Sequence, residues 1–188
     1  MYKILFDNIN HDENESKVIF SRGIYTAYPA HKLPEIKYTK IEFCGQPSGQ
    51  FDFSKEKNSG IIGDVSKSHI LFNNHADFIT LYCVKGLNGN IDFSYVRQLD
   101  MFATDLSCAN IKFNRNAQFI ALADIKGLRG YFDFSNVQVL DIGDCLYKSD
   151  ALKNVSGIKF NPKGLVFGIS ETRKQMLEVA YRNYETSK

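Results

Sequence analysis

The chain has few of the features by which a sequence signals a known chemistry. Its 188 residues carry 23 basic and 21 acidic side chains, so the net charge is only +2. No overall electrostatic field therefore favours nucleic acid, an anionic membrane or an acidic substrate as a partner. The glycine patterns GxxxxGK[ST] and GxGxxG, which bind phosphate groups, are absent, and so is the calcium-binding repeat GGxGxD.

Metal ligands and disulfides are also poorly represented. His69 and His75 form a His-x5-His pair without a carboxylate or thiol at ligand spacing, which is more typical of exposed loop histidines than of a metal site. The four cysteines lack CxxC spacing and lie in or beside apolar positions, which favours free core thiols in a reducing compartment. They are Cys44, Cys83, Cys108 and Cys145. We expect no metal and no cofactor.

Long hydrophobic runs are missing. The N-terminal run YKILF is too short for the hydrophobic region of a signal peptide, and no stretch approaches membrane-spanning length. We expect a cytoplasmic protein, or one exported by a route that leaves no such signal, without nucleic-acid or membrane partners.

The chain does contain an internal repeat. Residues 78–98 read FITLYCVKGLNGNIDFSYVRQ and residues 119–139 read FIALADIKGLRGYFDFSNVQV, so the two copies start 41 residues apart and share KGL and DFS. The intervening segment 99–118 has the same layout with different residues, which puts the structural unit at about 20 residues. This pattern predicts a solenoid.

Each unit holds two apolar triplets, and their outer residues would share the inward face of a short strand. The first triplets are Ile41-Glu42-Phe43, Gly60-Ile61-Ile62, Ile79-Thr80-Leu81, Leu99-Asp100-Met101, Ile120-Ala121-Leu122, Leu140-Asp141-Ile142 and Leu165-Val166-Phe167. The second triplets are Phe51-Asp52-Phe53, Ile70-Leu71-Phe72, Ile91-Asp92-Phe93, Ile111-Lys112-Phe113, Phe132-Asp133-Phe134 and Ile158-Lys159-Phe160. We predict a mainly β solenoid of about six coils, with two short strands per coil stacked into two parallel sheets or ribbons.

Both ends of the array would need a cap, because a solenoid exposes apolar core at its termini. We expect a single domain over 1–188, with a β-rich N-terminal cap at 1–40, coils at 41–169 and a helical cap at 170–188. Ser170 is a suitable N-cap residue. The apolar stripe of the helix would comprise Met176, Leu177, Ala180, Tyr181 and Tyr184.

The second triplets predict two ladders along the array. Their last residues form an expected buried column of Phe53, Phe72, Phe93, Phe113, Phe134 and Phe160. Their middle residues, Asp52, Leu71, Asp92, Lys112, Asp133 and Lys159, alternate in charge from the third coil onward. We interpret these charges as a device that fixes the register of the coils rather than as a binding site.

A family resemblance follows from the first triplets. The run Val137-x-x-Leu140-x-Ile142-x-x-Cys145-Leu146, with Val96-x-x-Leu99-x-Met101 and Ala117-x-x-Ile120-x-Leu122, resembles the strand half of leucine-rich repeats. The resemblance covers residues 41–169 and implies that partners bind the sheet of the first triplets.

The outward residues of that sheet are the candidate binding site. They are Glu42, Thr80, Tyr82, Asp100, Phe102 and Asp141. An aromatic pair bordered by carboxylates is typical of a protein-binding patch, where aromatic anchors are ringed by polar groups. Ordinary sheet decoration, or shielding by the N-terminal segment, would give the same pattern.

Two classes of function are compatible with these features. A non-enzymatic, protein-binding solenoid is our main hypothesis, and an immunity protein that neutralises a cognate bacterial toxin is its sharpest form, because of the chain's size and its similarity to toxin-antidote repertoires. A leucine-rich-repeat effector that binds a host protein is the alternative. A hydrolase would use Asp100 and Asp141, which lie two coils apart, about 9 to 10 Å. Ala121 lies between them and no further sugar-stacking aromatics follow, so we do not expect an enzyme.

Overall fold

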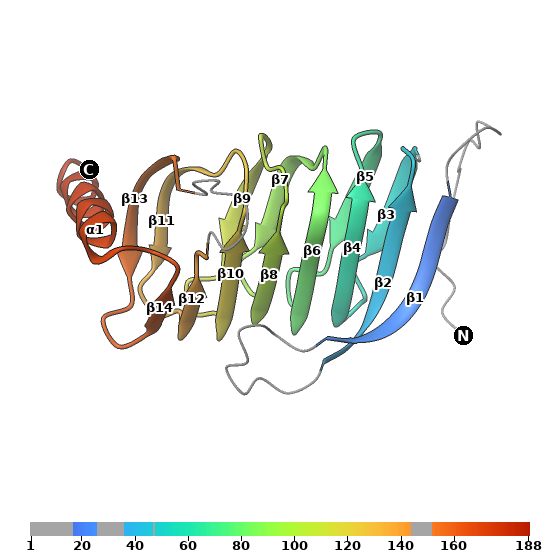
Figure 1. The fold of residues 1–188 in the computed structure, drawn as a ribbon, viewed down its shortest axis with the longest axis horizontal. Coiled ribbons are helices and arrows are strands. Elements are labelled where there is room, and N and C mark those ends of the chain that lie inside the picture. Colours follow the sequence, from blue (N-terminus) through green and yellow to red (C-terminus); the bar gives the residue numbers. More distant parts are fainter. Residues whose placement is uncertain (1–16, 26–35, 47, 144–151) are drawn as a thin grey trace.

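The protein is a β-solenoid. The computed structural model describes residues 17–25, 36–46, 48–143 and 152–188, with side chains described from Ile41 onward except Cys44. Strands make up 51% of the structure, which winds through about five turns spaced about 20 residues apart and ends in a C-terminal helix (Figure 1). The predicted mainly β repeat architecture is confirmed.

The seven first triplets and β1 form one continuous sheet of eight strands, in the order β1-β2-β4-β6-β8-β10-β12-β14. All neighbours are parallel except β1 and β2. The strands are β1 (Lys17–Tyr25), β2 (Ile36–Cys44), β4 (Asn58–Asp64), β6 (Phe78–Lys85), β8 (Gln98–Phe102), β10 (Phe119–Ala123), β12 (Val139–Asp141) and β14 (Leu165–Phe167).

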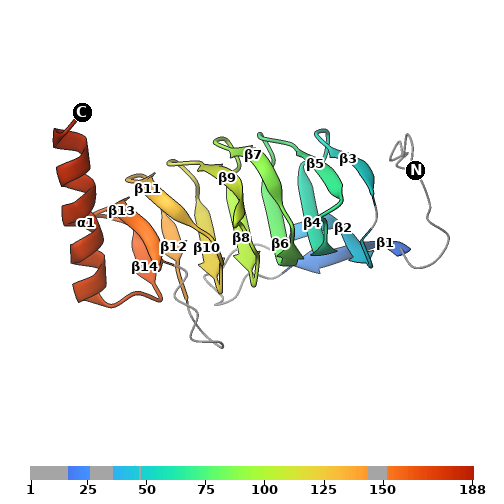
Figure 2. The ribbon, with the colours of Figure 1, turned by 90° about the horizontal axis from the view of Figure 1, so that it is seen from above.

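The second triplets form the other layer, which lies above the long sheet in the view of Figure 2. Its strands are β3 (Gly49–Phe53), β5 (Ser68–Phe72), β7 (Asn88–Phe93), β9 (Cys108–Phe113), β11 (Arg129–Phe134) and β13 (Asn154–Phe160). In the described part of the chain they pair only as β3–β5, β7–β9 and β11–β13. The expected ribbon is therefore divided into two-stranded pieces.

The corners explain why the sequence repeats every 41 residues although each turn has about 20. The KGL corners alternate with Asp-x-Ser corners, and each KGL glycine lies directly on the serine of the preceding turn. A Cβ atom on Gly86 would lie 2.4 Å from Ser66 Cα, and one on Gly127 would lie 2.5 Å from Ser107 Cα. Only glycine allows this approach, and both residues also have positive φ angles, 74° and 79°. The repeating unit is a pair of turns.

The opposite corners alternate in the same way. Asn73, Asn114 and Asn161 each accept a hydrogen bond from the backbone N–H two residues later. Their side-chain amides donate to the preceding turn, at the carbonyls of Glu56, Val96 and Val137. In the other turns Asp52, Asp92 and Asp133 accept from the N–H groups of Ser54, Ser94 and Ser135. The repeated DFS aspartates therefore close corners.

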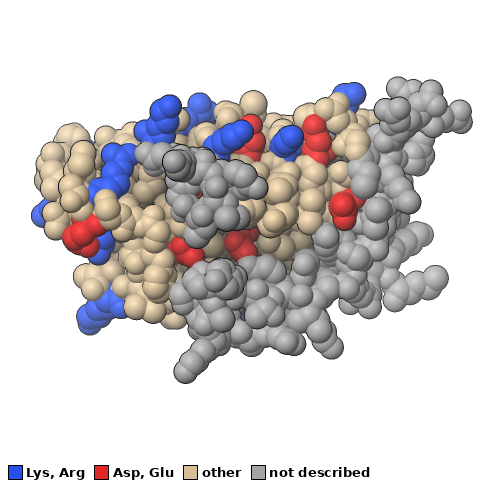
Figure 3. All heavy atoms as spheres, viewed as in Figure 1, with Lys and Arg blue, Asp and Glu red and all other residues tan. Residues whose placement is uncertain are grey.

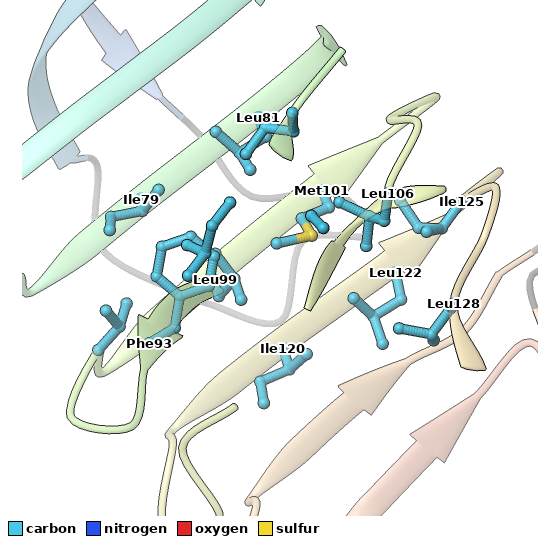
Figure 4. Packing of buried hydrophobic residues seen from close by; sticks show 14 of the residues in the cluster. Ile79, Leu81, Phe93, Leu99, Met101, Leu106, Ile120, Leu122, Ile125 and Leu128 are labelled. Atoms are coloured by element: carbon cyan, nitrogen blue, oxygen red, sulfur yellow. The ribbon is translucent and has the colours of Figure 1, made fainter. Parts of the chain in front are cut away.

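The interior between the layers is apolar. Figure 4 shows side chains of β6, β8 and β10 pointing inward beside Phe93. The predicted phenylalanine column is confirmed, since none of its six members is exposed. Burial varies along it: Phe53, Phe93 and Phe134 are at most 1% exposed and Phe160 is 5% exposed, whereas Phe72 and Phe113 are partly buried.

One predicted triplet had the wrong register. Ile61, expected to face outward, is buried in line with Ile41 and Leu81, and Ile62 lies on the outward face. Because Ile61 and Ile62 are identical and adjacent, the sequence pattern allows either of them to be the buried residue. A shift of one residue exchanges the two faces of a strand.

The predicted charge ladder is only partly present. Lys112 Nζ lies 3.8 Å from Asp92 Oδ2 across the β7–β9 pair. No ladder joins β9 to β11, so Lys112 does not continue to Asp133. Lys159 instead pairs with Glu185 of the C-terminal helix at 3.1 Å. The charges therefore pair within one pair of turns, β7 and β9, and between β13 and the helix, but not along the whole array.

The C-terminal helix α1 (Glu171–Thr186) begins as predicted, with the Ser170 side chain accepting from the N–H of Arg173. It packs on β13, where Gly157 lies so close that a Cβ atom would be 2.7 Å from the backbone nitrogen of Tyr181. Leu177 and Tyr181 are its buried residues. Met176 is 58% exposed, so the predicted apolar stripe is wrong there.

At the other end, β1 lies within the segment expected to form the β-rich N-terminal cap, and it pairs antiparallel with β2. The YKILF run at residues 2–6 lies outside the described residues.

Candidate functional site

The parallel register arranges the predicted site into two rows that cross the outward face of the long sheet. The aromatic row consists of Glu42, Ile62, Tyr82, Phe102 and Ala123. The carboxylate row consists of Gly60, Thr80, Asp100, Ala121 and Asp141. All six predicted residues therefore lie on one face, but in two separate rows.

The aromatic row contains a stacked pair at its centre. The ring centroids of Tyr82 and Phe102 lie 4.9 Å apart with an interplanar angle of 19°. Tyr82 is 48% exposed, and Phe102 is partly buried. The parallel register places the two rings on neighbouring strands at the same level, so each ring limits the rotamers of the other. The pair is a preformed apolar surface.

The backbone bends sharply just after this pair. Cys83 and Ala103 have φ angles of 53° and 49°, and Asp124 has 54° at the corresponding position of the next turn. Residues other than glycine seldom adopt this left-handed conformation. This conformation occurs in three successive turns, each time at the residue that directly follows the aromatic row.

The carboxylate row is less accessible than predicted. Thr80 and Asp141 are only 8% and 9% exposed, and Asp100 is partly buried. Asp141 Oδ1 accepts a hydrogen bond of 2.8 Å from the N–H of Gly143, so this carboxylate already has a partner within the chain. Burial, and secondarily the charge of Asp141, raise the pKa of Asp100 to about 7.

This arrangement was the basis for the hydrolase alternative. Asp100 and Asp141 flank Ala121 on adjacent strands, so they lie two strand spacings apart, about 10 Å. That is near or beyond the upper limit for an inverting carboxylate pair. The buried position of Asp141 also leaves little room for a substrate between the two groups.

A cavity of about 100 Å³ lies elsewhere, at the break between β9 and β11. Its lining includes Leu106, Ile111, Leu128, Arg129 and Phe132. None of these residues belongs to the two rows.

Among the described residues, no three His, Cys, Asp or Glu side chains gather as metal ligands. His69 and His75 are exposed. Cys83 and Cys108 are free thiols, but Cys108 is exposed rather than in the core as predicted. Cys145 lies outside the described residues. No helix in the described segments has the length and apolar character needed to cross a membrane.

The sequence did not identify two exposed or partly exposed apolar residues, one within the aromatic row and one at a corner. Ile62 extends the aromatic row, and it was missed because its triplet was read in the wrong register. Tyr95 is 57% exposed at a corner, where its ring stacks on His75 at 4.6 Å. The repeated apolar spacing could not identify Tyr95, because corners lie outside that spacing.

Comparison with protein-family models, with curated proteins and with solved structures finds no match for this chain.

Proposed function

We propose that this protein is a non-enzymatic scaffold that binds another protein through the aromatic row. The observation that carries the proposal is the partly exposed Tyr82–Phe102 stack on a rigid sheet. Aromatic side chains held in fixed rotamers lose little conformational entropy on association and are common hot spots of protein interfaces. Ile62 and Ala123 continue the row with apolar surface.

Within this class, we propose a cytoplasmic immunity protein that binds and neutralises a cognate bacterial toxin. A capped solenoid of 188 residues is large enough for one interface of standard size, about 800 Å² on each partner. The likeness of its first triplets to leucine-rich repeats supports the same use of the sheet. A leucine-rich-repeat effector bound to a host protein is the second candidate, because it would use the same face.

A hydrolase has less support. The raised pKa of Asp100 suits a general acid, but Asp141 is buried on the far side of Ala121. Measurable turnover by the purified chain would contradict the non-enzymatic proposal.

The test is co-purification with the product of the neighbouring gene, since antidotes are commonly encoded beside their toxins. Calorimetric titration of that product should then show that Tyr82→Ala or Phe102→Ala weakens binding by about 2 kcal/mol or more, because hot-spot aromatics contribute to association without supporting the core.

Tyr95→Ala is the matched control. It also removes an exposed tyrosine stacked on a ring of the neighbouring turn, but at a corner away from the aromatic row. If the Tyr82 and Phe102 variants bind the product no more weakly than the Tyr95 variant does, the aromatic row is not the binding surface.

A further inference from the structure

The outward face of the long sheet differs in charge from the rest of the molecule. Along the two rows from β4 to β12, the only charged residues are Asp100 and Asp141, and there is no Lys or Arg. The whole chain nevertheless carries 23 basic residues and a net charge of +2. In Figure 3, basic side chains lie along one edge and toward the helix, with some acidic ones among them, whereas the charged side chains visible over the middle of the face are acidic.

The acidic and apolar features of this face adjoin. Asp100 and Phe102 stand two residues apart on β8, so both point outward, about 7 Å apart along the strand. Tyr82 stacks beside Phe102 on β6, which widens the apolar surface at that end. An extended segment of another protein has the same spacing between alternate side chains. A segment lying along β8 could therefore place one side chain over each feature.

We propose that the partner presents an extended segment in which an arginine lies two positions from a large apolar residue, with the guanidinium over Asp100 and the apolar side chain over Tyr82 and Phe102. This inference rests on the proposed protein-binding function and adds the chemistry of the partner. Arginine suits the position because its planar, weakly hydrated group pairs with a carboxylate at an interface better than lysine does.

The electrostatics of the row support a cation at this place. Asp100 and Asp141 are both partly or largely removed from water, and the charge of Asp141 raises the pKa of Asp100. A positive charge beside Asp100 would relieve this repulsion and replace the solvation that the carboxylate has lost. An anionic partner group would increase the repulsion instead.

The experiment uses a random 12-residue peptide library displayed on phage, selected on the full chain at low salt. Peptides that also bind the Tyr82→Ala/Phe102→Ala double variant are removed by counter-selection. The enriched peptides are expected to carry arginine two positions from leucine or an aromatic residue. Enrichment of acidic or uncharged peptides, or no enrichment, would overturn the proposal.

A selected peptide is then synthesised and titrated. Asp100→Asn should weaken its binding at least about tenfold, which is about 1.4 kcal/mol. Replacing the arginine of the peptide by glutamate should have at least as large an effect. Lys112→Ala, on the other layer, should leave the affinity unchanged.

The outcomes separate this proposal from the function on which it rests. If the aromatic variants abolish binding but Asp100→Asn does not, the aromatic row remains a binding surface and the arginine contact is wrong. If neither set of variants changes affinity for the peptide or for the co-purified protein, both proposals fail.

Discussion

The phenylalanine column shows that residues in equivalent positions of the repeat can differ in burial. Phe93 is completely buried between the layers, whereas Phe113, one turn later, is only partly buried. The two residues have the same place in their triplets, so the sequence predicted the same role for both. Phe160, in the same position of the last coil, is again buried, at 5% exposed.

Truncation of Phe93 should test this burial. Phe93→Ala should lower the free energy of unfolding by about 3 to 5 kcal/mol, through lost apolar burial and the cavity left behind. Phe113→Ala should cost less, since part of that ring is already in water. Denaturant melts that show a loss under about 1 kcal/mol for Phe93→Ala would contradict its central position.

The raised pKa of Asp100 makes stability depend on pH in an unusual direction. Its pKa is 3.8 in ordinary surroundings and about 7 in the fold, so the folded state keeps a proton that the unfolded state releases between these values. The free energy of unfolding should therefore fall as pH rises from about 4 to about 7, by up to about 4 kcal/mol at 1.36 kcal/mol per pKa unit.

Asp100→Asn should remove this decline. Urea melts at pH 5 and pH 8 should show a clear loss of stability in the parent chain and a smaller one in the variant, which should be the more stable of the two at pH 8. Asp52, Asp64, Asp92 and Asp105 have lowered pKa values, so their contributions change only below about pH 4 and are common to both proteins. Parallel pH profiles would contradict the assignment.

The glycine corners provide a matched pair of substitutions. Gly86 and Gly89 have φ angles of 74° and 78°, so alanine is strained at either position by about 1 to 2 kcal/mol. A Cβ atom at Gly89 meets nothing within 4 Å, whereas one at Gly86 meets the backbone of Ser66.

Gly86→Ala should therefore cost at least about 1 to 2 kcal/mol more than Gly89→Ala, because the turns must move apart. Thermal or denaturant melts of the two variants measure this difference. Equal losses would show that the corners do not limit the spacing of the turns.

The Asp92–Lys112 pair should contribute little. Both side chains are well exposed, and the two charged atoms are 3.8 Å apart. Lys112→Ala should change the free energy of unfolding by less than about 1 kcal/mol, because exposed ion pairs are screened by solvent. A much larger loss in melts at moderate salt would mean that Lys112 has a second, buried role.

Strands and the helix were predictable from the sequence because their signals are local. The triplets predicted the strands of both layers, and Ser170 predicted the start of α1. Spacing alone could not reveal the division of the second layer, because Lys112 and Asp133 occupy matching positions in turns that do not pair. The register at Ile61 was missed for a similar reason, since Ile62 fits the pattern equally well.

For the molecule as a whole, the repeat determines that Tyr82 and Phe102 stack, since parallel strands in register bring equivalent positions together. The burial of Thr80 and Asp141, which are 8% and 9% exposed, was not predictable, because alternation along a strand assigns a residue to a face but does not give its exposure. The continuous sheet thus has an accessible aromatic row beside a more buried carboxylate row, and the former is the stronger candidate for binding.

Side-chain footprinting of the complex tests this account most directly. Hydroxyl radicals oxidise tyrosine and methionine according to their exposure, and Tyr82, Tyr95 and Met176 start at similar values of 48%, 57% and 58%. With the co-purified partner bound, oxidation of Tyr82 should fall several-fold, while that of Tyr95 and Met176 should stay unchanged. Unchanged oxidation of Tyr82, with protection of Tyr95 or Met176 instead, would show that the partner binds another surface.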